Sequence, residues 1–391
     1  MELRPRPLED LDRTLAMNRL TESELRLAYS GRRVLVTGHT GFKGGWLTLW
    51  LHHLGAQVTG YALPPATDPS FFRATNLEGL CQHVLGDIRD QQALRKTVAS
   101  SHPEFVFHLA AQPLVRASYQ TPVETIETNI LGTAHLLEAI RQERLSCAVV
   151  VVTSDKCYEN REWVYGYRET DRLGGRDIYS MSKAGTELLV SAYRSSFFPP
   201  DRISEHGVAL ATARAGNVIG GGDWAVDRIV PDAIRALSSG RPVPVRNPNS
   251  VRPWQHVAEP LCGYLTLGRH LDAADEKRSS YCDAWNFGPG GAAVQTVVQL
   301  VEAIIQRWGS GSWTDEHDPR SAAEARRLQL SIEKSREYLH WSPRWELGQA
   351  LDYTVEWYRA FHPSAAYELR ALTQHQLVRY METAFAATPD C

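Results

Sequence analysis

Side chains that can transfer protons lie close together in the middle of the sequence: a hydroxyl, a carboxylate, a phenol and two amines. Ser154, Asp155 and Lys156 end an apolar, β-branched run, and Tyr179 and Lys183 follow at a spacing of four residues. Four residues are about one helical turn, so Tyr179 and Lys183 share a helix face. The unperturbed pKa of tyrosine is about 10, and a nearby ammonium favours the phenolate. The set therefore predicts proton transfer coupled to hydride transfer, with Ser154, or else Thr153, holding the reacting hydroxyl.

Asp155 and Lys156 exceed what a simple alcohol dehydrogenase needs. Once an alcohol becomes a ketone, the proton on the neighbouring carbon is acidic, and a base can remove it while an acid expels water from the next carbon. Asp155 fits the acid, and a neutral Lys156 fits the base. The alternative for this pair is a surface ion pair, and the alternative for Tyr179 and Lys183 is a solvated helix face.

A glycine-rich loop, Gly38-His-Thr-Gly41-Phe-Lys-Gly44, follows the first predicted strand and opens a helix. In that context glycines make a tight turn and let backbone approach a diphosphate, and the helix N-terminus attracts phosphate. The loop predicts dinucleotide binding; the alternative is a strand–helix turn that is merely rich in glycine. The expected cofactor contacts here are Gly38, Thr40, Gly41, Phe42, Lys43 and Gly44.

The end of the second predicted strand bears on the choice of cofactor. It reads Val58-Thr-Gly-Tyr-Ala62, without the acid that usually binds the ribose 2′-hydroxyl of NAD. It also lacks an Arg or Lys for the 2′-phosphate of NADP. We expect NAD.

The elements that must position these residues alternate between strand and helix, which indicates βαβ units and a parallel sheet. Continuous apolar strands suit a sheet covered on both faces. The predicted strands are Arg33–Thr37, Gln57–Ala62, His83–Asp87, Glu104–Leu109, Cys147–Thr153 and Gly207–Ala213. The predicted helices are Lys43–Leu54, Asp90–Ser100, Thr121–Gln142, Tyr179–Phe197, Val294–Arg307, Glu346–Phe361 and one near Ala365–Phe385.

The fold expected is α/β: a Rossmann-type doubly wound sheet with a smaller, mixed C-terminal substrate lobe. Residues 1–30 are expected to be an extension that packs on the body or on a neighbouring subunit, with Thr21-Glu-Ser-Glu24 as a capping box that opens a short helix. Residues 31–215 form the NAD-binding domain. Residues 216–391 form mainly the lobe, which returns to the edge of the sheet at least once.

The bulk composition excludes several classes of protein. The chain has 391 residues, a formal net charge of −3 and no long basic block, so nucleic acid is not an expected partner. Six cysteines without a C-x-x-C pair indicate reduced thiols in a cytoplasm, with no metal site. We expect neither a membrane span nor a secretory signal, because no apolar run is long enough.

Several segments resemble the extended short-chain dehydrogenase/reductases, and within them the nucleotide-sugar 4,6-dehydratases. Where dTDP-sugar dehydratases have Thr-Asp-Glu, this chain has Ser154-Asp155-Lys156, which is similar to the CDP-glucose 4,6-dehydratases. The resemblance covers roughly residues 31 to 357. Its segments are Gly38-His-Thr-Gly-Phe-Lys-Gly-Gly-Trp46, Ala110-Ala-Gln-Pro-Leu-Val-Arg116, Thr153-Ser-Asp-Lys-Cys-Tyr-Glu-Asn160, Arg214-Ala-Gly-Asn-Val-Ile-Gly-Gly-Gly-Asp-Trp224, Asp227-Arg-Ile-Val-Pro231 and Arg252-Pro-Trp-Gln-His-Val257.

The resemblance implies further roles. Asp87 and Ile88 would contact the adenine, although Asp87 could instead cap the next helix. Ala110 and Ala111 would lie beside the cofactor. The diphosphate of the sugar nucleotide would be bound by Asn217, Arg228 and Arg252, since Arg donates paired hydrogen bonds to phosphate. The helices within 121–142 and 179–197 would form the interface of a homodimer or larger homo-oligomer.

The reaction implied is conversion of CDP-glucose to CDP-4-keto-6-deoxyglucose with NAD recycled. Two enzyme alternatives stay open: a nucleotide-sugar 4-epimerase, and a 4,6-dehydratase acting on another nucleotide hexose. The alternative outside enzymes is an NAD(P)-sensing binding protein, which would have no need of Tyr179 or Lys183.

Overall fold

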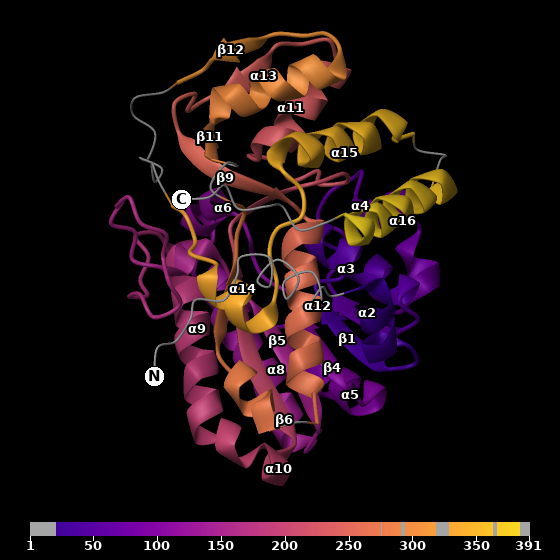
Figure 1. Cartoon of the computed structure of the whole chain (residues 1–391), viewed down its shortest axis with the longest axis vertical. Helices are drawn as coiled ribbons and strands as arrows, with labels where there is room; N and C mark the ends of the chain where they lie inside the picture. Colours follow the sequence, from indigo (N-terminus) through magenta and orange to yellow (C-terminus); the bar gives the residue numbers. More distant parts are fainter. Residues whose placement is uncertain (1–20, 275, 291–293, 318–327, 363–365, 384–391) are drawn as a thin grey trace, which may run out of the picture.

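A seven-stranded parallel sheet forms the centre of the molecule (Figure 1). The computed structural model describes residues 21–274, 276–290, 294–317, 328–362 and 366–383. The strand order is β10-β6-β5-β4-β1-β2-β3, which reverses direction between β1 and β4 and confirms the doubly wound fold. The strands are β1 (Arg33–Thr37), β2 (Gln57–Ala62), β3 (Gln82–Leu85), β4 (Phe105–His108), β5 (Cys147–Val152), β6 (Val208–Ala215) and β10 (Ala284–Phe287).

Helices cover both faces of this sheet. Alternate side chains of β1 point to opposite faces: Val34 and Val36 join one hydrophobic core, and Leu35 joins the other. The first core contains α2 (Glu22–Tyr29), α3 (Phe42–His53) and α12 (Ala258–Asp272), and the second contains α5 (Gln91–Ser101), α8 (Gly132–Gln142) and α9 (Ile178–Ser196). Burial on both faces explains why the central strands are apolar without interruption.

Several predicted boundaries differ from the structure, most of them by one or two residues. β3 ends at Leu85, two residues earlier than predicted. The next residue, Gly86, lies so close to the Tyr61 ring that a Cβ on it would be 2.3 Å away. The helix predicted over 121–142 is α7 (Pro122–Ile126), a π-helical turn η2 (Glu127–Leu131) and α8. The helix predicted from Val294 is first β11 (Val294–Thr296) and then α13 (Val297–Trp308), which begins at a Thr296–Gln299 capping box.

The smaller lobe lies at the top of Figure 1, beyond the carboxyl ends of the central strands. A three-stranded sheet joins β11, β9 (Val251–His256) and β7 (Asn217–Ile219), and a second pairs β12 (Trp313–Asp315) with β8 (Val243–Val245). The expected return to the main sheet occurs at β10, which pairs with β6. The lobe also contains α11 (Ile229–Ser238), α13 and α15 (Leu347–Ala360).

The remaining elements are short or peripheral. They are α4 (Phe71–Ala74), α6 (Val115–Gln120), α10 (Ile203–His206), α14 (Glu333–Leu339), α16 (Ala366–Glu382) and the 3₁₀ turns η1 (Leu77–Leu80), η3 (Asp155–Cys157), η4 (Pro200–Arg202) and η5 (Glu276–Tyr281). Residue 365 at the start of the last predicted helix and residues 384–385 at its end fall outside the described part. No helix in the described ranges is long and apolar enough to cross a membrane.

Helix α2 begins with the predicted capping box, in which the Glu24 N–H donates to the Thr21 hydroxyl and the Thr21 N–H donates to the Glu24 carboxylate. Leu25 and Tyr29 are fully buried in the core on the α12 face. The Tyr29 hydroxyl donates to the Leu265 carbonyl at 2.7 Å. Helix α2 is thus part of the hydrophobic core, while the leucines of 1–20 are outside the described residues.

Candidate active site

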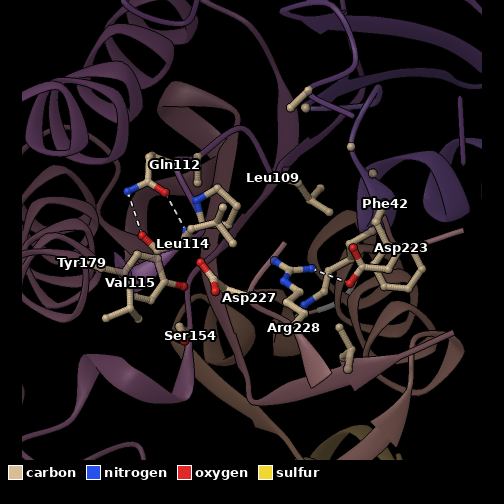
Figure 2. Close-up of a pocket in the computed structure, with 18 of the residues that line it drawn as sticks. Phe42, Leu109, Gln112, Leu114, Val115, Ser154, Tyr179, Asp223, Asp227 and Arg228 are labelled. Atoms are coloured by element: carbon tan, nitrogen blue, oxygen red, sulfur yellow. Dashed lines mark hydrogen bonds and ion pairs between the residues drawn. The ribbon is translucent and has the colours of Figure 1, made fainter. Parts of the chain in front are cut away.

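A cavity of about 690 Å³ opens where the carboxyl ends of β1, β4 and β5 face the smaller lobe. This is the position at which open α/β sheets bind ligands. Every cofactor, catalytic and substrate residue predicted from the sequence lines it, so the structure brings the whole predicted set together. Figure 2 shows Ser154 and Tyr179 on one side of the cavity and Phe42, Asp223 and Arg228 on the other.

The glycine loop has the close approaches that the sequence predicted. Gly38 has a φ of 79°, and a Cβ there would lie 2.7 Å from the Ala110 nitrogen. A Cβ on Gly44 would lie 2.1 Å from the Gly38 carbonyl oxygen, so only glycine lets α3 start so near the strand. Gly41 caps α3 without a side chain. A bare helix N-terminus in a side-chain-free cradle fits a dinucleotide diphosphate.

The loop after β4 is held in place by buried polar groups. The Thr37 hydroxyl bonds to His108 Nδ1 at 2.7 Å and accepts from the Ala110 N–H at 3.3 Å. Asn129, in the π-helical turn η2, accepts from the Gln112 N–H and donates to its carbonyl. These contacts position Ala110 and Ala111 along the cavity wall.

Asp87 does not cap the next helix. The Asp90 carboxylate does so, by accepting from the N–H groups of Gln92 and Ala93. Asp87 instead binds Arg89 in a two-point ion pair, and this guanidinium lowers the pKa of Asp87. Arg89 also lines the cavity and was not predicted, because a pair two residues apart leaves no periodic signal.

The Ser154-Asp155-Lys156 segment forms the 3₁₀ turn η3 directly after β5. The Ser154 hydroxyl accepts from the Lys156 N–H at 3.2 Å and donates to Asp155 Oδ1 at 2.9 Å. Asp155 is 5% exposed, so the pair is not a surface ion pair. A Cβ on Gly216 would lie 2.9 Å from Asp155 Oδ2, so this glycine gives the carboxylate its space.

Burial sets the protonation of Asp155. It raises the pKa of the carboxyl, and the Lys156 ammonium and the Ser154 hydroxyl only partly oppose the rise. A carboxyl that keeps its proton more readily than usual is suited to act as a general acid.

Tyr179 and Lys183 are buried on α9, which contradicts the solvated-face alternative: their exposed fractions are 8% and 6%. The Asp177 side chain caps the helix by accepting from the Ser180 N–H. Burial raises the pKa of Tyr179 to about 12, partly offset by a hydrogen bond with Ser154. Burial lowers the pKa of Lys183 to about 8, and the Glu187 carboxylate opposes that shift. In the protein alone, Tyr179 is therefore a phenol at neutral pH.

The lobe side of the cavity is rich in arginine. Asn217 and Arg252 lie on the paired strands β7 and β9, and Arg228 precedes α11. Arg228 donates to Asp223 at 2.7 Å (Figure 2). Asp223, Asp227 and Arg116 lie in segments that carry the family resemblance but were given no role, and Arg246 was not singled out. Asp227 pairs with Arg116 at 3.2 Å and with Arg246 at 2.6 Å. These pairs join residues far apart in sequence, although the glycines before Asp223 mark a loop.

Three features define a Rossmann-type protein with a dinucleotide-binding cavity: the order of the strands, the glycine loop and the buried Tyr179–Lys183 pair. The chain belongs to the family described as GDP-mannose 4,6 dehydratase, whose model matches residues 35–354.

Two relatives are similar over most of their length. CDP-glucose 4,6-dehydratase from Salmonella typhimurium strain LT2 is 50% identical over 336 residues, 85% of this chain and 92% of that one. A dTDP-glucose 4,6-dehydratase from Xanthomonas campestris pv. campestris is 25% identical over 351 residues, 83% and 92% of the two chains.

Solved structures share the fold at lower identity. A dTDP-glucose 4,6-dehydratase from Streptomyces venezuelae with NAD bound has a TM-score of 0.70 and 22% identity, covering 84% of this chain and 97% of that one. UDP-glucose 4-epimerase from Thermus thermophilus in complex with NAD has a TM-score of 0.70 and 24% identity, covering 84% and 100%. The fold alone does not choose between these two activities.

Proposed function

We propose that this protein converts CDP-D-glucose to CDP-4-dehydro-6-deoxy-D-glucose and uses NAD that is recycled in each turnover. The observation that carries the proposal is the position of Asp155 and Lys156, which share one cavity with Tyr179 and Lys183. The 50% identity to an enzyme of this name supports the choice of substrate. Lys156 in place of a glutamate supports it as well.

The residues divide the reaction between them. The glycine loop, Tyr179 and Lys183 would hold NAD, which would supply the hydride acceptor for C4 and the hydride donor for C6, and whose positive charge would favour the Tyr179 phenolate. Tyr179 takes the proton of the C4 hydroxyl while Ser154 holds that oxygen, and the C4 ketone that forms makes the C5 proton acidic. Lys156 removes this proton in its neutral amine form, and Asp155 protonates the C6 hydroxyl, which leaves as water. The C5 carbon then regains a proton from Lys156 as C6 is reduced.

The cofactor and the substrate are assigned to different residues of the one cavity. The cofactor is held by Gly38, Thr40, Gly41, Phe42, Lys43, Gly44, Asp87, Ile88, Ala110, Ala111, Tyr179 and Lys183, of which the glycine loop offers the diphosphate cradle described above. Asn217, Arg228 and Arg252 bind the diphosphate of the sugar nucleotide. The free cysteines among the described residues support a reducing compartment, and we place the protein in the cytoplasm.

The protein acts as a homodimer through α7, η2 and α9. Opposite its catalytic face, α9 carries a stripe of Met181, Gly185, Leu188 and Ala192, spaced as one helix face. Leu188 is 61% exposed, and Val123 and Leu131 on the adjoining elements are 66% and 48% exposed. Large apolar side chains exposed together on two packed helices favour a protein interface.

The test is a substrate panel. The protein, with NAD, is incubated with the CDP-, dTDP-, UDP- and GDP-glucose substrates, and the products are analysed by NMR. The expected result is a 4-keto-6-deoxy sugar from CDP-glucose. Release of a C4 epimer would instead favour the 4-epimerase. Faster dehydration of another nucleotide sugar would favour a 4,6-dehydratase acting on that substrate. NAD binding without turnover would favour a binding protein.

A further inference from the structure

A third ionisable residue continues the catalytic face of α9. Glu187 follows Lys183 by one helical turn, as Lys183 follows Tyr179. Its exposed fraction is 4%, and it does not line the cavity. Its carboxylate accepts hydrogen bonds from the Thr153 hydroxyl, from the Thr212 hydroxyl at 2.7 Å and from Arg214 Nη2 at 2.9 Å. These donors lie on β6 and at the end of β5, so Glu187 joins the catalytic helix to two strands.

The partner of Glu187 is itself fixed. Arg214 is 3% exposed, and its Nη1 donates to the Tyr158 hydroxyl at 2.8 Å and to the Glu169 carbonyl at 3.0 Å. Tyr158 in turn donates to Asn286 on β10 at 2.8 Å. A buried ion pair with this many additional hydrogen bonds specifies one geometry, although its net contribution to stability is small.

The network meets the catalytic residues at two places. Thr153 directly precedes Ser154, so its bond to Glu187 fixes the strand end from which η3 starts. Lys183 lies one turn away on the same face, with its ammonium 3.4 Å from the Val152 carbonyl. The ionisable groups facing Lys183 are Lys43 on α3, His108 on β4, Cys157 on η3 and Glu187. Glu187 is the carboxylate in that set.

We infer that Glu187 is a positioning residue for this reaction: it fixes Ser154 and Asp155 against Tyr179 and Lys183, and its negative charge keeps Lys183 protonated. The inference rests on the proposed function, because it assumes the roles given there to these four residues. Arg214, Arg194 and Cys157 are further ionisable groups around Glu187, so replacing the carboxylate leaves the buried Arg214 guanidinium without its anionic partner and Lys183 without a nearby negative charge.

The test compares Glu187→Gln with wild type in the pH dependence of CDP-glucose turnover. Without the carboxylate, Lys183 loses its proton more easily, so the descending limb at high pH should move down by about one pH unit. Loss of the Thr153–Glu187 bond should also shift the η3 turn that holds Ser154 and Asp155, which should lower kcat about tenfold or more. KM should change less than twofold, because Glu187 does not line the cavity. Glu187→Asp keeps the charge and should return the limb toward its wild-type position while kcat stays low.

Glu259→Gln is the matched control, since Glu259 on α12 is also a buried glutamate paired with buried donors but lies outside the cavity. It should alter the melting temperature without moving the limb. If Glu187→Gln does not fold, the Glu187→Gln/Arg214→Met double variant, which removes both buried charges, replaces it. The inference would be overturned if the folded variant kept the high-pH limb of the wild-type turnover profile and a kcat within twofold of the wild-type value. Wild-type protein without turnover contradicts the proposed function instead.

Discussion

The Asp155 carboxyl, the proposed acid in the turn after β5, depends on a neighbour that has no side chain. Gly216 follows β6 and faces Asp155, and a methyl group there would overlap the carboxylate at 2.9 Å. The backbone of Gly216 is not in the left-handed region, so space alone explains the glycine. The position of the Asp155 carboxylate therefore depends on the residue after β6 as well as on the turn after β5.

Gly216→Ala should displace Asp155 and slow the loss of water about 10²-fold, while oxidation at C4 continues. The measurement is single-turnover analysis of the C4 ketone and of the dehydrated product. Gly79→Ala is the control, because a Cβ at Gly79 meets nothing within 4 Å. Equal dehydration rates in Gly216→Ala and wild type would remove Asp155 from the acid role.

Lys156→Met should keep C4 oxidation but lose exchange at C5. The methionine has a similar length and no basic nitrogen, so the C5 proton has no acceptor, and turnover should fall about 10²- to 10⁴-fold. Incubation with CDP-glucose in D₂O, followed by NMR of the sugar, measures deuterium at C5. Full deuterium incorporation by Lys156→Met would show that another group is the base.

The sequence predicts single residues well where the motif is local. Tyr179 and Lys183 were found because both lie on one helix, and the glycine loop because its turn and helix are contiguous. Glu187 shares that helix face, but its meaning comes from Thr153, Thr212 and Arg214, which only the folded sheet brings to it. The Asp223–Arg228 pair was missed for a similar reason.

At the level of elements, one buried carboxyl ties α16 and the segment before α15 to α12. Glu259 is fully buried and accepts from the Arg344 and Trp345 N–H groups and from the Tyr380 hydroxyl. Burial raises its pKa to about 7, which those donors only partly oppose. The folded protein therefore holds this proton more tightly than the unfolded chain does.

This linkage makes stability depend on pH in a definite direction. A group whose pKa is raised on folding contributes stability at pH values below its unfolded pKa, and loses that contribution as the pH rises through the folded value. For Glu259 the loss runs from about pH 4.5 to about pH 7 and is roughly 3 kcal/mol. The difference in unfolding free energy between wild type and Glu259→Gln, measured in urea across that range, should change accordingly; a constant difference would contradict it.

Helices α11 and α12 were not predicted from the sequence, each for its own reason. Helix α12 is buried on nearly all sides and its N-terminus has no side-chain cap, so it shows neither the period of an amphipathic helix nor a start signal. Helix α11 carries Pro231 in its first turn, where proline is tolerated but suggests a loop in the sequence. The strands of the sheet, by contrast, are contiguous apolar runs.

For the molecule as a whole, the α9 stripe predicts the assembly. Leu188→Glu places a charge on the proposed interface and should convert the proposed dimer to a monomer in sedimentation experiments, because a buried unpaired carboxylate is costly. Leu27→Glu is the control: Leu27 is 87% exposed on α2, away from the stripe. If Leu188→Glu and the wild-type protein have the same mass in solution, the α9 stripe is not the interface.

The docking of Tyr29 limits how the chain can be shortened for experiments. A form that begins at Gly31 would still contain all of residues 35–354, but it would uncover the Phe105 ring, whose centroid lies 4.7 Å from that of Tyr29. Such a form should melt at a lower temperature than one that begins at Thr21. It should also expose an apolar, aggregation-prone surface over the main sheet. A designer who trims this protein to its family match would thus remove part of its core.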